Sequence, residues 1–594
     1  MVYCICFIFA VLVLLITAVF FVRKNGNKLM TAGVGVFLAM LALFFPADSG
    51  RDVTNVFTSI VSALFRSIRV FGLNEDFITS EFDFGSLPVW FSTAYICLLD
   101  LLYLFAPVLT FGLILSIFSN ISSGIRFMFS ISRDIFVFSD KNIRAGIIAA
   151  DIRKQNPRAV IVFYNSEGGS FGENEKAISF SKEVLTINRI ILRFSKHITF
   201  YICSDDENAN IRITSELLEI VGKNPELVRK LGKNTRSDRG IDLFYYCSKK
   251  RSLPILSNLD KCHVRVRRIN EIQNVIYNLI YEEPVLKYVD KSRDTVNIAV
   301  VGAGRYGEEF IRAAIWSGQH RKYRLNINVF DSRDIRESFT NQYPELVNTE
   351  RLSDSKDISY KINFFDRKDF FGINIEDIGE MNSLDLAFVA LGNDDANIEA
   401  SLYLRECSER MKAKPRIFTI ITDMNLKNAD MVNNLKNHKG AEYNIGFILP
   451  NDIFSRDKAI ALENMGRNMH KMWAVHSNPE IPEDKIDYSD FYDYEFFYWS
   501  SVASTMFWRI RKNLGENTLP NEENMRLEHQ RWSAYMRSEG YRYAEKRNDM
   551  AKQHNDLVAY DMLSKNIKEN DKFPILFAEE IDKAEQNKQK SGKD

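Results

Sequence analysis

TVNIAVVGAGRYG, residues 295–307, is the most informative stretch of this sequence. Its apolar, β-branched half predicts a buried strand, which leads directly into Gly302, Gly304 and Gly307 at the spacing G-x-G-x-x-G. The residues that follow, EEFIRAAIWSG, have the periodicity of a helix. In this order Gly302 permits a tight turn, Gly304 lets the backbone approach a pyrophosphate, and Gly307 lets helix and strand pack closely. The stretch therefore predicts phosphate binding at a helix N-terminus.

Further strand patterns follow this turn. The first, LNINVFDS, ends in Asp331, where an acid accepts a hydrogen bond from a ribose hydroxyl; Arg333 could instead meet a phosphate. Four more apolar runs end in polar residues and are separated by helix-length segments: KINFFD, DLAFVALGND, RIFTIITD and NIGFILPND. Repeated βα units of this kind predict a doubly wound, Rossmann-type α/β domain over 295–452. The alternative is that the glycines serve packing alone.

Length and composition limit the classes of function that this chain can have. A chain of 594 residues predicts three or four domains at roughly 150 residues each. Lys+Arg and Asp+Glu both number 77, so the charge does not indicate a nucleic-acid partner. The seven cysteines are odd in number and include no C-x-x-C pair, which predicts neither a disulfide framework nor a metal site.

Residues 1–125 predict an α-helical membrane region with three spans, at about 2–22, 29–45 and 89–118. Basic residues follow the first span, and the positive-inside rule places them in the cytoplasm: Arg23, Lys24 and Lys28. We therefore expect a multi-pass protein of the inner (cell) membrane, with its C-terminal domains in the cytoplasm.

Two features of this membrane region have two interpretations each. Residues 53–69 form an amphipathic helical pattern, which either lines a water-filled path when subunits assemble or lies on the bilayer surface. Asp100 falls within the third span, where a carboxylate is costly unless it faces protein or water. Asp100 is therefore a candidate functional residue of the membrane region, unless it lies near the membrane surface.

Residues 133–285 predict a second set of βα units. The segment FYICSDDENANI resembles FVALGNDDANI of the glycine-containing domain, and each follows the corresponding fourth strand, which indicates an internal duplication. This copy lacks the glycines, because its turn reads SDKNIRAG and carries Asp140, which repels a phosphate. We expect it to act as a scaffold or in dimerisation.

The motifs VVGAGRYG, Asp331 and LGNDDAN resemble the ligand-sensing domains of potassium channels and transporters, the RCK or Trk-type NAD-binding family. The resemblance covers 133–452 as a tandem pair. It implies that NAD or another adenine nucleotide binds as a regulatory ligand, usually in a homo-oligomeric ring, although no potassium-filter sequence accompanies it. The residues it assigns to the ligand are Gly302, Gly304, Arg305, Tyr306, Gly307, Asp331, Arg333, Gly392, Asp394 and Asn397.

The C-terminal part predicts helices. An aromatic helical connector at 457–515 precedes a segment at 520–580 that resembles the RyR domain, the small helical repeat of ryanodine receptors. It departs from the family pattern in having Tyr541 in place of Trp and Asn555 in place of Pro. Its ligand candidates are His529, Trp532, Tyr541 and Tyr543, with packing as the alternative role. The polar tail at 583–594 predicts disorder.

These patterns together favour a nucleotide-sensing membrane effector, a ligand-gated channel or pore controlled by its cytoplasmic domains. By analogy alone, such a protein would act in stress responses or antiphage defence. One alternative is a non-conducting, membrane-anchored regulatory subunit of a transporter. The other is an NAD-using enzyme, but no catalytic pair is evident, because Tyr306 and His320 are close only in sequence.

Overall fold

The computed structural model divides into two compact units, Met1–Phe129 and Ser130–Asp594, called here the N-terminal and C-terminal units. The residues that it describes are 2–23, 28–49, 56–71, 82, 84–85, 87–128 (with 86 left out), 133–165, 177–187, 192, 197–233, 240–248, 261–366, 382–422, 445–449, 456–482, 486, 491 and 495–591. Some sequence predictions fall outside these residues: Lys24, the start of the amphipathic segment at 53–55, the domain limit at 452 and the last residues at 592–594.

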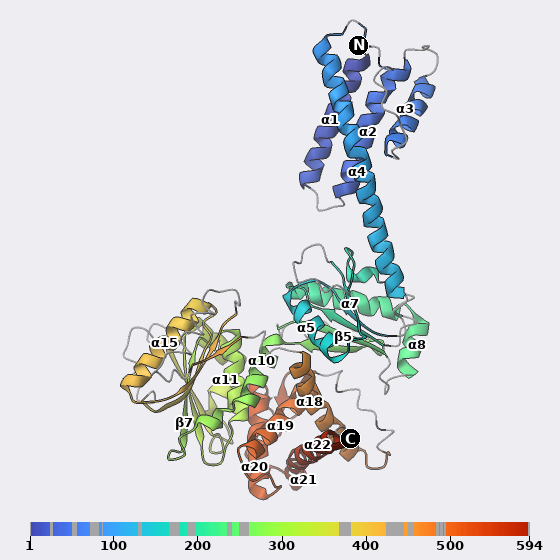
Figure 1. The fold of residues 1–594 in the computed structure, drawn as a ribbon. Coiled ribbons are helices and arrows are strands. Elements are labelled where there is room, and N and C mark those ends of the chain that lie inside the picture. Colours follow the sequence, from blue (N-terminus) through green and yellow to red (C-terminus); the bar gives the residue numbers. More distant parts are fainter. Residues whose placement is uncertain are drawn as a thin grey trace. The chain divides into compact units, whose positions relative to one another are not determined.

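The N-terminal unit consists of helices (Figure 1): α1 (Val2–Arg23), α2 (Lys28–Ser49), α3 (Val56–Phe71) and α4 (Val89–Met128). They overlap the segments predicted as spans and as the amphipathic helix, but α4 continues beyond the predicted end at 118. Tyr95 of α4 is buried and donates a hydrogen bond of 2.5 Å to the carbonyl of Leu43 in α2. In the described part of the chain, one helix is long and apolar enough to cross a membrane, Val89–Thr110, and two shorter helices are apolar, Val2–Ala18 and Thr31–Pro46.

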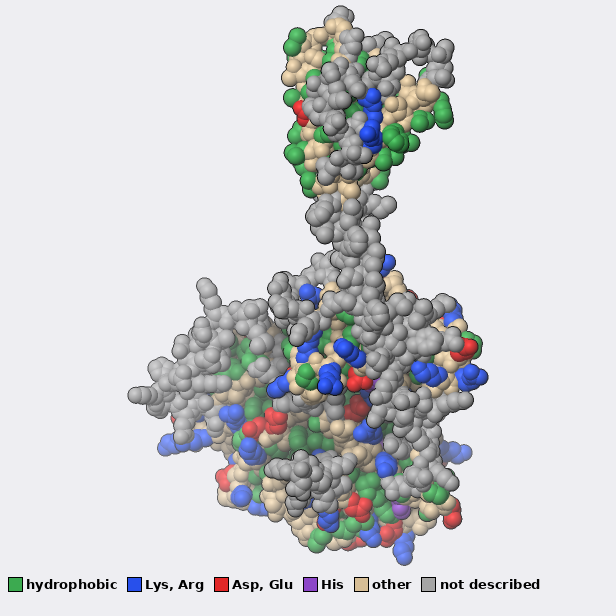
Figure 2. Space-filling view, turned by 45° about the vertical axis from the view of Figure 1, so that its right-hand side comes forward, with side chains coloured by type: hydrophobic (Ala, Val, Ile, Leu, Met, Phe, Trp, Pro, Cys, Tyr) green, Lys and Arg blue, Asp and Glu red, His purple; other side chains and the backbone are tan. Residues whose placement is uncertain are grey.

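The surface of the N-terminal unit is apolar. Helix α3 buries its small residues Ser59, Ala63 and Ser67, and it exposes large ones such as Phe57 and Phe65. Small residues at spacings of four allow close helix packing. Figure 2 shows mostly hydrophobic and uncharged side chains on this unit, and basic and acidic side chains scattered over the C-terminal unit. Most of the exposed large hydrophobic residues among those described belong to the N-terminal unit.

The C-terminal unit begins with a six-stranded sheet, the first Rossmann sheet. Its strands are β1 (Asp134–Phe138), β2 (Val160–Phe163), β3 (Ile178–Ser179), β4 (His197–Ile202), β5 (Gly240–Tyr246) and β6 (Arg265–Ile269). All its pairs are parallel, in the order β3-β2-β1-β4-β5-β6. The accompanying helices are α5 (Ile143–Gln155), α7 (Glu207–Gly222), α8 (Pro225–Lys233) and α10 (Glu271–Glu282).

The second Rossmann sheet repeats this topology. Its strands are β7 (Thr295–Val301), β8 (Arg324–Asp331), β9 (Tyr360–Asp366), β10 (Leu384–Val389), β11 (Arg416–Ile420) and β12 (Ile445–Ile448). All are parallel, in the order β12-β11-β10-β7-β8-β9, which from the other edge is the same order as in the first sheet. Its helices are α11 (Arg305–Ser317), α12 (Arg333–Gln342), α13 (Pro344–Val347) and α15 (Asp394–Arg410). This strand order, 3-2-1-4-5-6, defines a doubly wound dinucleotide-binding topology in both sheets.

The C-terminal helices are α18 (Arg456–Ser477), α19 (Glu495–Asn513), α20 (Glu522–Ser538), α21 (Lys565–Asn570) and α22 (Lys572–Ser591), with the short strands β13 (Arg542–Tyr543) and β14 (Gln553–His554). Single 3-10 turns lie at Val184–Thr186, Val285–Tyr288, Thr349–Arg351 and Tyr560–Met562. The predicted disorder from Lys583 differs from the structure, because α22 continues to Ser591. Lys583 pairs with Glu579 one turn earlier at 2.9 Å, an arrangement that supports a helix.

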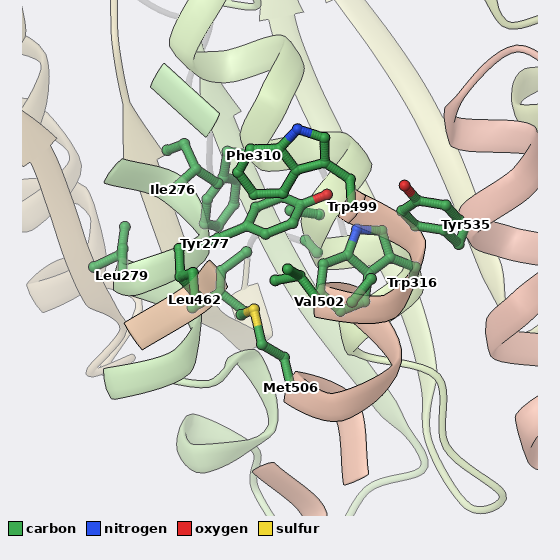
Figure 3. Packing of buried hydrophobic residues seen from close by; sticks show 14 of the residues in the cluster. Ile276, Tyr277, Leu279, Phe310, Trp316, Leu462, Trp499, Val502, Met506 and Tyr535 are labelled. Carbon is green, nitrogen blue, oxygen red and sulfur yellow. The ribbon is translucent and has the colours of Figure 1, made fainter. Parts of the chain in front are cut away.

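The second Rossmann sheet and the C-terminal helices share one hydrophobic core (Figure 3). The ring centroid of Tyr277 in α10 lies 5.3 Å from those of Trp316 in α11 and Trp499 in α19. Trp316 also lies 6.3 Å from Tyr535 in α20. Aromatic pairs at such distances stabilise a core beyond the area they bury. The helices therefore hold α11, which carries the glycine turn at its start, in a fixed place.

Candidate functional site

The glycine turn has a distinct geometry at each glycine. Gly302 has a φ of +91°, and a Cβ there would lie 2.4 Å from the carbonyl oxygen of Ala390. A Cβ at Gly307 would lie 1.9 Å from the carbonyl oxygen of Gly302. At Gly304, by contrast, no described heavy atom lies within 4 Å of the Cβ position, and the backbone is in the ordinary extended region. Two glycines are thus required by the fold, while the third faces open space.

The N-terminus of α11 is not capped by a side chain. Gly304 is its N-cap residue and provides none. Four helices of the same unit that follow strands of the two sheets are capped by a side-chain oxygen, from Asn142 in α5, Asp206 in α7, Asn270 in α10 and Asn393 in α15. The first N–H groups of a helix need acceptors, and the helix dipole favours an anion there. The start of α11 can therefore take its cap from a ligand.

Asp331 and Arg333 lie beside this turn. Asp331 accepts hydrogen bonds from the backbone N–H of Ala303 and of Ser332, both at 2.6 Å. Arg333 pairs with Glu337 at 2.8 Å along α12, and its side chain is exposed. The carboxylate of Asp331 therefore braces the glycine turn, and a ribose hydroxyl would have to share it. Arg333 has room to turn toward a phosphate.

The remaining residues of the predicted set have structural contacts. Asp394 accepts from the backbone N–H of Thr422 at 3.0 Å and from its hydroxyl at 3.1 Å. Asn397 is buried, accepts from the N–H of Leu391 at 2.6 Å and donates to the carbonyl of Ile420 at 2.9 Å. These side chains tie the end of β10 to the end of β11. Gly392 has a φ of +82°, with open space at its Cβ position among the described residues.

A cavity of about 390 Å³ lies at the carboxyl ends of strands from both Rossmann sheets. This is the edge at which open α/β sheets bind ligands. From the second sheet it is lined by Arg305, Tyr306 and Thr422, so two of the predicted residues reach it. The first sheet contributes Asn142, Ile143, Arg144, Ser204, Asp205, Glu207, Tyr246, Cys247, Ser248, Ile269, Glu271 and Ile272. The sequence prediction missed these residues, although the repeat SDDENAN marked their place after β4.

Charged pairs cross this cavity. Arg305, whose side chain is 64% exposed, contacts Glu207 of the first sheet at 3.0 Å, and Ser248 donates to the same carboxylate at 2.5 Å. Arg144 contacts Asp205 at 3.0 Å and Glu271 at 3.1 Å. Burial lowers the pKa of Arg144, but Glu271 and Asp205 outweigh it, and the pKa lies above its usual value. Burial raises the pKa of the Tyr306 hydroxyl.

The other predicted residues lie apart from this cavity. His529 and Trp532 of α20 line a second cavity, of about 440 Å³, within the C-terminal helices. Tyr541 is buried outside that cavity's lining, and Tyr543 is exposed, with its backbone N–H donating to Glu345 at 3.1 Å. Asp100 is exposed on α4 of the N-terminal unit. His320 follows the far end of α11, roughly 20 Å from Gly304 at 1.5 Å per residue.

No family model matches this chain, and no curated protein does. Among solved structures, a protein titled GsuK Channel aligns with 12% identity over 73% of this chain and 98% of its own, with a TM-score of 0.31. A dipicolinate synthase chain from Bacillus halodurans aligns with 10% identity over 56% of this chain and 98% of its own, with a TM-score of 0.19. At these scores neither likeness adds to what the strand order defines: a chain with two Rossmann-type sheets.

Proposed function

We propose that this protein is a nucleotide-sensing membrane effector, in which a nucleotide bound at the glycine turn controls the N-terminal helices. The observation that carries the proposal is the start of α11, which follows a glycine turn, has no side-chain cap and is open at Gly304. The ligand class is NAD or another adenine nucleotide, because a pyrophosphate fits a helix N-terminus reached through G-x-G-x-x-G. The resemblance of VVGAGRYG to RCK or Trk-type domains supports this class.

The pair between Arg305 and Glu207 supplies a route from ligand to conformation. Arg305 stands at the first turn of α11, where a bound phosphate would lie, and it now contacts a carboxylate of the first sheet. A phosphate competes with Glu207 for this guanidinium, because both are anions that accept charge-assisted hydrogen bonds. Binding would then weaken the link between the two sheets. Ligand binding shifts a population only through such a difference between states.

The apolar surface of the N-terminal unit supports membrane insertion. Helices α1, α3 and α4 expose large side chains such as Phe9, Phe57 and Leu104. A surface of this kind needs an apolar cover, which the hydrocarbon of a bilayer provides. On this proposal the N-terminal unit lies in the inner (cell) membrane, the C-terminal unit lies in the cytoplasm, and several copies assemble into a ligand-gated channel or pore. A role in stress or antiphage defence extends the proposal by analogy only.

The packing of α3 favours a second candidate, a non-conducting membrane anchor that regulates a partner transporter. Ser59, one of the hydroxyl residues on the polar side of the amphipathic pattern, is buried on the inner side of α3, as is Ser67, whereas Thr58 of the same polar side is exposed. A conducting assembly would need to draw its polar path from other residues, for which exposed Asp100 is the candidate. An NAD-using enzyme is the third candidate.

The test is ion flux from liposomes that contain the purified full-length protein. NAD, ADP-ribose and cyclic nucleotides are added one at a time, to the parent protein and to Gly304→Val. Since Gly304 has ordinary backbone angles and open space, valine leaves the fold intact but occupies the place of the phosphates. Flux that depends on one nucleotide and disappears in Gly304→Val supports the gated pore.

Gly304→Ala is the control for side-chain size and should give an intermediate response. Nucleotide binding without ion flux would favour the non-conducting anchor instead. Consumption of the bound nucleotide, measured by chromatography of the products, would favour the enzyme instead. Unchanged nucleotide affinity in Gly304→Val would remove the glycine turn as the site.

A further inference from the structure

The cavity of about 440 Å³ among the C-terminal helices has the construction of a ligand site. It lies within the C-terminal unit, between α18, α19, α20, α21 and the start of α22. Its lining residues are Met469, His470, Trp473, Ser500, Ser501, Ser504, Glu528, His529, Arg531, Trp532, Met536, Arg547, His554, Asp556, Ile567, Asn570, Asp571 and Pro574. Ligand sites typically occupy about 300–1,000 Å³ and combine aromatic walls with a few convergent polar groups.

Aromatic rings form part of its wall. Trp532 lies 4.9 Å from His554 in an edge arrangement and 5.6 Å from His529 in a stacked one, both measured between ring centroids. Trp473 of α18 also lines the cavity. Rings fixed by their neighbours in this way present flat faces to a planar guest at little cost in conformational entropy.

Two buried polar atoms in this lining make no hydrogen bond with the described residues: Nη1 of Arg531, and Oδ2 of Asp571, which lies 3.6 Å from Nδ1 of His529. Arg531 is 2% exposed; its other nitrogens contact Glu528 at 2.5 and 3.2 Å, and Glu528 also accepts from Trp508 at 2.7 Å. Buried polar groups in folded proteins are almost always paired. A guanidinium N–H and a carboxyl oxygen in one cavity, both without a hydrogen bond, therefore point to a guest that supplies partners for the two groups.

The charge of the lining argues against an anion as that guest. Arg531 is neutralised by Glu528 at 2.5 Å, and Arg547 contacts Asp549 at 3.0 Å. Burial, and after it the nearby Glu528, raises the pKa of Asp571 to about 9, so this side chain is a neutral acid at pH 7. Burial lowers the pKa of His529 to about 4, and its Nε2 donates to the carbonyl of Val558 at 2.9 Å, which leaves Nδ1 as an acceptor.

We propose that this cavity binds a planar nitrogen heterocycle of the nucleobase class, with one face on Trp532 and its hydrogen-bonding edge on Asp571 and Arg531. Proteins hold single bases in this manner, by stacking on aromatic rings and hydrogen bonds to one edge. A protonated carboxyl offers a donor beside an acceptor, which complements the paired donor and acceptor on the edge of a base. The site is separate from the glycine turn and stands whether or not that turn binds a nucleotide.

The test is calorimetric titration of the full-length protein in detergent with adenosine, guanosine, cytidine and uridine. The Gly304→Val protein is used throughout, so that binding at the glycine turn does not contribute. We expect at least one nucleoside to bind. Trp532→Ala should weaken it about tenfold or more, which is the size of a lost base-to-ring stack. Asp571→Leu, which has a similar volume and no polar atoms, should weaken it comparably.

Two further variants separate recognition from folding. Asp571→Asn keeps a donor beside an acceptor and should bind within about threefold of its parent, a change well below the loss of a hydrogen bond. Asp561→Leu replaces an exposed acid that pairs with Arg526 outside the cavity, and it should bind like its parent. The proposal is overturned if none of the four nucleosides binds the Gly304→Val protein, or if Asp571→Leu binds as tightly as Asp571→Asn.

Discussion

The two Rossmann sheets have the same strand order, but the helix that follows the first strand begins differently in each. In the second sheet, two residues separate β7 from the N-cap, which is Gly304. In the first sheet, three residues separate β1 from the N-cap, which is Asn142, and its side chain accepts from the N–H of Ala145 at 3.0 Å. The first copy thus caps its helix with its own side chain, and the second copy leaves the N-terminus of its helix without a side-chain cap. A repeated fold can therefore keep its topology while the N-terminus of its first helix differs between the copies.

The two copies also differ in where a carboxylate lies relative to the turn after the first strand. In the first sheet the acid is on the turn, where Asp140 accepts from Asn165 at 2.7 Å. In the second sheet the acid follows the second strand, where Asp331 accepts from the turn at 2.6 Å. One arrangement puts a negative charge where a phosphate would lie, and the other uses a negative charge to orient the turn. That Asp140 excludes a phosphate from the first copy stays a prediction.

The largest expected difference between the copies concerns the third residue of each helix. Gly307→Ala should destabilise the protein by about 3 kcal/mol or more, because its Cβ would lie 1.9 Å from the carbonyl oxygen of Gly302. The equivalent residue of the first copy is already alanine, and Ala145→Gly should cost only about 1 kcal/mol. Thermal denaturation of the full-length variants in detergent measures both. Equal losses would show that the two turns do not differ in how closely helix and strand pack.

A second contrast lies in a buried acid of each sheet. Asp242 contacts Arg265 at 2.7 Å, Arg267 at 3.2 Å and His197 at 2.6 Å. Burial would raise the pKa of Asp242, but Arg267, the hydrogen bond with His197 and Arg265 outweigh it and hold the pKa below its usual value. Asp385 is also buried and pairs with Arg293, and burial dominates there and raises its pKa. The two acids should therefore give opposite dependences of stability on pH.

The signs follow from linkage between protonation and folding. Because the folded pKa of Asp242 is depressed, its contribution is present above the unfolded pKa, near 4, and is lost as pH falls through the folded value. For Asp385 the folded pKa is raised, so stability is lost as pH rises from the unfolded toward the folded value. At pH 7, Asp242→Asn should cost about 3 kcal/mol by removing the buried carboxylate that Arg265 and Arg267 share, and Asp385→Asn should cost less. Melting temperatures of the parent and both variants from about pH 2 to 8 test this, because the change due to Asp242 lies below about pH 4, and parallel profiles of the two variants would contradict it.

Much of the fold could be predicted from the sequence because it depends on local signals. The glycine spacing, the apolar runs and the repeat of SDDENAN in GNDDAN define two parallel sheets without knowledge of any contact. The roles of Asn210 and Asn397 could not be predicted in this way. Each is buried and joins the loop after its fourth strand to the carbonyl at the end of the fifth, Tyr246 or Ile420. The resemblance assigned Asn397 to a ligand, but the same bond in both copies marks a structural tie.

The packing of the C-terminal helices on the glycine-containing sheet could not be predicted from the sequence either. Arg537 is 2% exposed and pairs with Asp354 at 2.8 Å, 183 residues away in the chain. Arg312 is buried and donates to the carbonyl of Ser538 at 2.6 Å. Arginine on a helix is usually exposed, and no local pattern shows which arginine finds a buried partner. The sequence therefore indicated helices at 457–580 and did not indicate that they pack on the glycine-containing sheet.

A substitution of Asp331 tests what the acid of the second copy does. Asp331→Ala removes the bond to the turn and should weaken NAD binding by about 2 kcal/mol, the size of a hydrogen bond to a charged group. Inorganic pyrophosphate separates two explanations, since it has no ribose. Equal losses for NAD and pyrophosphate would mean that Asp331 orients the turn, and a loss for NAD alone would mean that it binds the ribose. Asp394→Ala, which frees Thr422 instead, should leave both affinities unchanged.

The smallest expected effect concerns the pair that joins the two copies. Glu207→Gln removes the anion that competes for Arg305, so NAD affinity should rise about threefold, within the range of up to about 1 kcal/mol for an exposed ion pair. Arg305→Ala should lower the affinity, because the phosphate loses its cation.

Glu271→Gln is the matched control: it removes a carboxylate from the same cavity, but one that pairs with Arg144, and it should leave the affinity unchanged. A rise in affinity in Glu271→Gln as large as in Glu207→Gln would assign the effect to the net charge of the cavity. A rise only in Glu207→Gln, with reduced dependence on salt, would mean that the first copy acts on the second through this single contact.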